Sequence, residues 1–130
     1  MRVLRSIAAV VAGLAVCFVL VMVSIAAAMA AFGLRMGDVP SRAYLVTNLS
    51  VSFVAAILGG FVCARVARAR ELVHGAAAAA VLVALSFVSG ADAGTHQPRW
   101  YLPVVTVLSV CGILLGTLAQ LSIKRFNRSN

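Results

Sequence analysis

Few side chains in this sequence have the types and spacing that catalysis or metal binding requires. Glu71 and His74 form an E-x-x-H, which places both residues on one face of a helix. A di-iron bundle uses that motif twice and adds two further glutamates, whereas Glu71 is the single glutamate of this chain. We therefore expect no metal at this motif. We interpret Glu71 as a carboxylate that favours the positive N-terminus of a helix.

The remaining candidate catalytic and metal-binding groups are equally sparse. Asp92 and His96 could touch one ion, but two ligands do not complete a zinc site. Cys17, Cys63 and Cys111 follow no spacing motif, so we interpret them as small apolar packing residues without a disulfide framework. No serine–histidine–aspartate set and no phosphate-binding loop is readable. The sequence predicts a protein that is not an enzyme and holds no metal or cofactor.

Composition indicates what surrounds the chain. Of 130 residues, 63% are hydrophobic and 11% are charged, whereas an ordinary soluble domain has about 25% charged residues. A soluble core of this size cannot hide so much apolar surface, but a bilayer can. The net charge of +8 does not indicate nucleic-acid binding, because the cations stand at the ends of apolar stretches and form no single patch.

Charged residues bracket four apolar stretches, at residues 6–34, 43–64, 73–91 and 100–123. About 20 residues cross a hydrocarbon core as a helix. We therefore expect an all-α membrane protein, a single domain over residues 1–130 with four transmembrane helices. The third stretch is short and only mildly apolar. The first is about twice as long as the apolar region of a signal peptide, so we expect it to remain as a span.

The cations also predict the orientation of the four spans. With both termini cytoplasmic, eight cations face inward and three face outward, as the positive-inside rule requires. Tyr44, Trp100 and Tyr101 then fall at the outer interface, which amphipathic rings favour. We expect a multi-pass protein of the cell (inner) membrane. Anionic lipid head groups are the expected partners of five inner cations. These predicted head-group anchors are Arg65, Arg68, Arg70, Lys124 and Arg125.

Small and polar residues inside the spans predict helix contacts. Gly112 and Gly116 form a G-x-x-x-G with Gln120 one turn further along, and Gly60 lies on a similar stripe in the second span. Asn48 and Ser52 could line a path for a solute, but we favour hydrogen bonds between helices. The stripes do not tell intramolecular packing from self-association. No charged residue lies inside a span, which argues against proton-coupled transport.

One segment has a resemblance. The run from Gly59 to Arg68, a Gly-Gly-aromatic-x-x-Ala-Arg hairpin followed by Glu71 and His74, resembles small bacterial four-helix membrane proteins that have no assigned function. The close likeness covers about 16 residues, and the layout of the spans extends it loosely to most of the chain. It implies the four-helix fold and adds no activity.

The sequence therefore predicts a small membrane protein that acts without catalysis, as an accessory or scaffold subunit, through contacts between helices. One alternative is a homo-oligomeric channel or uncoupled transporter lined by serine, threonine, asparagine and glutamine. A second is a lipid-modifying enzyme, which would need Glu71, His74, Asp92 or His96 at an interface. A membrane-protein partner or self-association is expected, and nucleic acid is not.

Overall fold

The computed structural model describes residues 2–35, 38–67, 70–91 and 98–129, and all regular structure within these ranges is helical. The helices are α1 (Arg2–Phe32), α2 (Arg42–Ala67), α3 (Glu71–Ala91) and α4 (Tyr101–Ser129). The all-α prediction is confirmed, and each helix is long and apolar enough to cross a membrane. Even the shortest, α3, has 21 residues and so a length of about 32 Å.

The helices do not end where the charges predict the spans to end. α4 continues past Lys124 to Ser129, and α1 ends at Phe32, two residues before the predicted boundary. Cations are favourable near the C-terminus of a helix, so a charged residue can mark the edge of the apolar segment while the helix continues. The charge pattern therefore locates the apolar segments better than it locates helix termini.

Local capping explains the connection between α1 and α2. Gly33 follows α1 with φ of 64°. The Leu34 amide donates to the Met29 carbonyl at 3.0 Å, a Schellman closure in which glycine takes the left-handed position. Ser41 then precedes α2, and its Oγ accepts from the Tyr44 amide at 3.2 Å, as an N-cap serine does.

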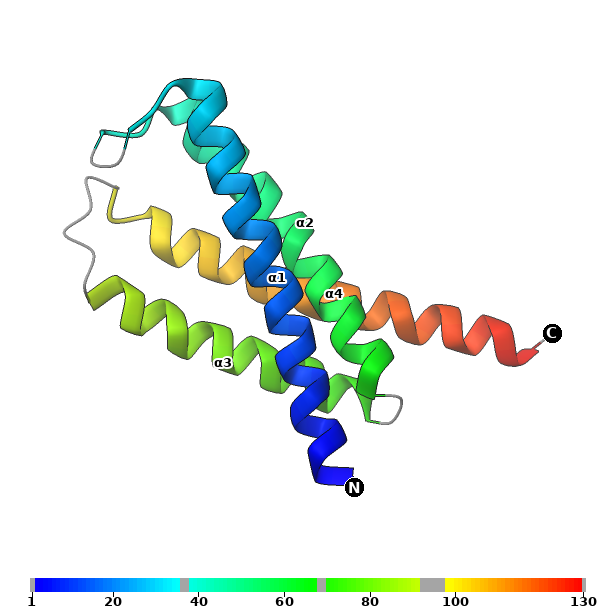
Figure 1. The fold of residues 1–130 in the computed structure, drawn as a ribbon. Helices are drawn as coiled ribbons and strands as arrows, with labels where there is room; N and C mark the ends of the chain where they lie inside the picture. The colour runs from blue at the N-terminus through cyan, green and yellow to red at the C-terminus, as the bar shows by residue number, and fades with distance from the viewer. Residues whose placement is uncertain (1, 36–37, 68–69, 92–97, 130) are drawn as a thin grey trace.

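Consecutive helices run antiparallel, and α2 lies at the centre of the arrangement (Figure 1). α1 and α2 run together as one pair and cross the pair formed by α3 and α4 (Figure 1). α2 packs closely against both α1 and α4, whereas α1 and α4 do not pack against each other over their described residues. The fold is consequently an open four-helix arrangement built around α2, in which α1 stands apart from α4.

Small side chains form the core where the helices cross. A separate cluster of Tyr44, Leu45 and Tyr101 lies near the connection between α1 and α2, and the Phe32 ring packs edge-on against Tyr44 with centroids 6.1 Å apart. The small side chains of the central cluster allow close backbone approach, on which packing in lipid depends. The central cluster consists of Cys17, Ala55, Ala56, Cys63, Ala78, Ala79 and Ile113.

Candidate functional site

The structure brings three predicted small residues together where α2 crosses α4. A Cβ atom added to Gly60 would overlap the carbonyl oxygen of Ile113, and one added to Gly116 would overlap the carbonyl oxygen of Ile57. At Gly112 it would lie 2.8 Å from the Ala56 methyl group. The two backbones are therefore in direct contact along this crossing, which only hydrogen in place of a side chain permits.

Two further glycine contacts join α1 to α2 and α3 to α4. A Cβ atom on Gly13 would lie 2.6 Å from that of Cys63. On Gly75 it would lie 2.5 Å from the hydroxyl of Thr117. Thr117 is fully buried, and its hydroxyl lies 2.9 Å from the Ile113 carbonyl and 3.4 Å from the Gly60 carbonyl. Thr117 thus connects three helices at one point, a role that the sequence pattern did not reveal.

Asn48 makes a hydrogen bond between helices near the start of α2. Its Nδ2 donates to the hydroxyl of Tyr101 on α4 at 2.7 Å, and both side chains are buried. Ser52, one turn further along α2, is also buried. The bond is the kind of contact that the sequence favoured for Asn48. Its partner was not predicted, because Tyr101 was assigned to the head-group layer.

Five other hydroxyls of the described helices bond within their own helix. Each donates to the carbonyl four residues earlier, at 2.5–3.1 Å, as serine and threonine commonly do in apolar helices. These bonds satisfy the hydroxyl hydrogens without a bound solute. The residues are Ser24, Ser50, Ser86, Thr106 and Ser122.

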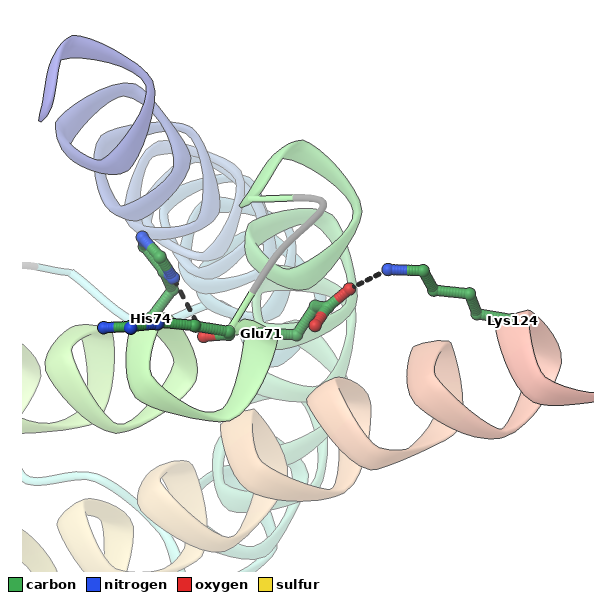
Figure 2. A network of polar contacts seen from close by, with 4 residues as sticks. Glu71, His74 and Lys124 are labelled. Carbon is green, nitrogen blue, oxygen red and sulfur yellow. Dashed lines mark hydrogen bonds and ion pairs between the residues drawn. The ribbon is translucent and has the colours of Figure 1, made fainter. Parts of the chain in front are cut away.

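The predicted residue Gln120 lies at the opposite end from Asn48, in a polar pocket of about 430 Å³. Its Oε1 is buried and has no hydrogen-bond partner. Beside it, Lys124 of α4 forms an ion pair with Glu71 at the start of α3, and Figure 2 shows the lysine reaching across to the carboxylate. The lining residues, which we call the inner pocket, are Ala64, Arg65, Glu71, Gln120, Lys124 and Arg128.

The two residues of the E-x-x-H motif make separate contacts. The His74 side chain points away from Lys124 (Figure 2), and its Nδ1 lies 3.0 Å from the Arg70 carbonyl oxygen. Within the described ranges, no three His, Cys, Asp or Glu side chains gather to hold an ion. Asp92 and His96 lie outside the described residues.

The described members of the predicted head-group anchors lie near the start of α3 and the end of α4. Arg65 lines the inner pocket, and Lys124 takes part in its ion pair. Arg70 is exposed just before α3 with φ of 51°. Arg125 is exposed on α4 and does not line the pocket. Arg68 lies outside the described residues. The sequence identified these cations separately but not that Arg128 joins Arg65 and Lys124 around Gln120.

An apolar groove of about 640 Å³ is lined by α1, α3 and α4, beside the contact between α1 and α3. We call it the α1 groove. Leu14, Ala15 and Val21 of α1 form one wall, and α3 and α4 supply the opposite wall. Ser52 of α2 and Ser109 of α4 lie at its buried floor. The groove exists because α1 and α4 do not pack together.

Comparison with protein-family models, curated proteins and solved structures finds no match to this chain.

Proposed function

We propose that this chain is a multi-pass membrane protein with both termini in the cytoplasm, acting as a non-enzymatic accessory subunit that holds a helix of a partner membrane protein. Four helices of sufficient length and apolar character support insertion. The excess of cations at the end shared by the N-terminus and Lys124 supports the orientation.

The α1 groove is the observation that carries the accessory role. It is apolar along its walls, as an occupant within the bilayer requires, and small residues such as Ala15 leave room for close approach. Its floor has the hydroxyls of Ser52 and Ser109. An acyl chain has no group that can form a hydrogen bond with a hydroxyl, whereas a helix has polar side chains and carbonyl groups that can. The floor therefore favours a helix as the occupant.

The glycine contacts supply the rigidity that a scaffold needs. Gly60 and Gly116 place backbone against backbone, so α2 and α4 have little freedom to slide or separate. Interiors packed this closely transmit strain and are not continuously deformable. We infer that α2 and α4 form the fixed part of the molecule, and that α1 provides the wall closing on the partner helix.

The test is the native mass of the protein extracted gently from its own membrane, with co-purifying chains identified, for the wild type and two matched variants. Ala15→Leu fills the α1 groove, and Ala26→Leu makes the same change at an exposed position of α1 outside it. The proposal expects a defined partner that Ala15→Leu releases and Ala26→Leu retains. If both variants retain the partner, the partner does not bind in the α1 groove. A homo-oligomer without another chain replaces the proposal by the channel alternative.

A further inference from the structure

The inner pocket has a combination of groups that points to a ligand. Three cations and one carboxylate line it, so positive charge exceeds negative charge by two. Glu71 is paired with Lys124, and this leaves Arg65 and Arg128 as the source of the excess. Arginine presents a planar fork of N–H donors that matches the oxygens of a phosphate group.

Gln120 adds a requirement that a phosphate by itself does not meet. Its Oε1 is buried at the pocket without a hydrogen-bond donor, and an unsatisfied buried acceptor is costly. A phosphate diester has no hydrogen to donate. A ligand that suits both features therefore carries a phosphate for the arginines and a hydroxyl for Gln120.

We propose that the inner pocket binds the head group of an anionic phospholipid that bears a hydroxyl beside its phosphate, as phosphatidylglycerol does. The phosphate lies between Arg65 and Arg128. The Gln120 amide, whose Oε1 is buried at the inner pocket, rotates on binding so that Oε1 accepts from a glycerol hydroxyl. The proposal rests on the proposed membrane insertion, because the pocket lies where the apolar part of α4 gives way to its basic end. The acyl chains then lie along apolar helix faces, which a soluble glycerol phosphate cannot exploit.

Specific binding differs from general attraction to an anionic surface, and α4 offers a control for the difference. Arg125 carries the same charge as Arg128 near the end of the same helix but does not line the pocket. A diffuse surface effect depends on the number of cations near the membrane and treats both arginines alike. A built site depends on Arg128 and not on Arg125.

The experiment measures lipid retained by the detergent-purified full chain in native mass spectrometry. The lipids are short-chain phosphatidylglycerol, phosphatidylmethanol (an anionic phosphate diester without a hydroxyl) and phosphatidylcholine, and free glycerol phosphate is the competitor. We expect retention in the order phosphatidylglycerol, phosphatidylmethanol, phosphatidylcholine, and weak competition by the free compound. Arg65→Gln and Arg128→Gln should each weaken phosphatidylglycerol binding about tenfold, because each removes a charge-assisted hydrogen bond. Arg125→Gln should leave it within about twofold of wild type.

Gln120→Leu separates the hydroxyl contact from the charge contact. It should lower the retention of phosphatidylglycerol to that of phosphatidylmethanol, a loss of about threefold to tenfold. The lipid-free variant should be at least as stable as wild type, since an unpaired acceptor is replaced by an apolar side chain. This second readout shows that loss of lipid does not come from loss of fold.

Three results would overturn the proposal. They are an equal effect of Arg125→Gln and Arg128→Gln, unchanged lipid preference in Gln120→Leu, and equal competition by free glycerol phosphate, which would assign the pocket to a soluble ligand. None of these bears on the accessory role, because the partner test uses the α1 groove. Failure of the partner test likewise leaves the lipid measurement intact, and a chain that does not insert at all contradicts both.

Discussion

The contact between α2 and α4 predicts a large penalty for a very small substitution. Gly60→Ala adds one methyl group, which would overlap the Ile113 carbonyl oxygen and lie 2.7 Å from the carbonyl carbon. The obstacle is backbone, so no rotamer change relieves it. A separation of about 0.7 Å would restore the 3.4 Å of ordinary van der Waals contact to the carbonyl carbon alone, and the closer oxygen requires more. A gap of about 0.5–1 Å already forfeits a quarter to a half of each dispersion contact along the crossing.

The magnitude follows from two opposing effects. Overpacking typically costs about 1–3 kcal/mol, and alanine recovers up to about 1 kcal/mol through its better helix propensity. We expect a net destabilisation of about 1–2 kcal/mol, or about a fivefold to thirtyfold larger open population. Gly116→Ala, which meets the Ile57 carbonyl oxygen, should behave in the same way, and the two effects should not add because both act on one crossing.

The chain contains its own reporter for this measurement. Cys17 and Cys63 are buried and Cys111 is exposed, so in a Cys111→Ser background a thiol-reactive dye labels the protein only when it opens. If the helices open and close faster than the dye reacts, the labelling rate is proportional to the fraction of molecules that are open. Ala119→Val adds carbon atoms at an exposed position of α4 and should leave the rate near that of the parent. Labelling of Gly60→Ala at the parent rate would refute the backbone contact.

Three other outcomes are expected. Asn48→Leu and Tyr101→Phe should each destabilise the fold, and a double-mutant cycle measured by the same thiol labelling should give a coupling of about 0.6–2 kcal/mol; additive effects would contradict the bond. Glu71→Gln should destabilise the packing of α3 on α4 by about 1 kcal/mol. The double exchange Glu71→Lys with Lys124→Glu should be less destabilising than the sum of its two single exchanges, although a lysine is unfavourable at the positive N-terminus of α3, and thiol labelling of these variants checks the difference. In the folded wild type, a lipid-soluble maleimide should react with Cys111, which is exposed on the surface of α4, faster than with the buried Cys17 and Cys63; equal rates at all three thiols would contradict the described core.

The helices were predictable from the sequence because charge and length constrain them strongly. Charged residues are costly within a hydrocarbon layer, so the brackets from Arg5 to Lys124 mark four apolar segments without knowledge of how they pack. The stripe of Gly112 and Gly116 likewise follows from helical periodicity, which fixes the residues that share a face. Which helix meets that face does not follow from periodicity.

The partners within the site were not predictable for the same reason. Asn48 and Tyr101 are 53 residues apart, as are Glu71 and Lys124, and their meeting depends on how α4 crosses α2 and α3. The sequence contained one usable signal, which is that a lone glutamate and a lone lysine were both expected at the cytoplasmic boundary. No sequence pattern predicted the α1 groove, because α1 has apolar residues around its whole circumference and no face is marked as the one without a partner.

The measurement that tests the central claim most directly is side-specific labelling of single cysteines in intact cells, in a background without native cysteines. Val39→Cys lies in the exposed connection between α1 and α2, and Asn127→Cys lies in the exposed last turns of α4. A membrane-impermeant maleimide should label Val39→Cys in intact cells and Asn127→Cys only after permeabilisation. Labelling of Asn127→Cys from outside would contradict the four crossings with cytoplasmic termini, and with them the position given to the inner pocket.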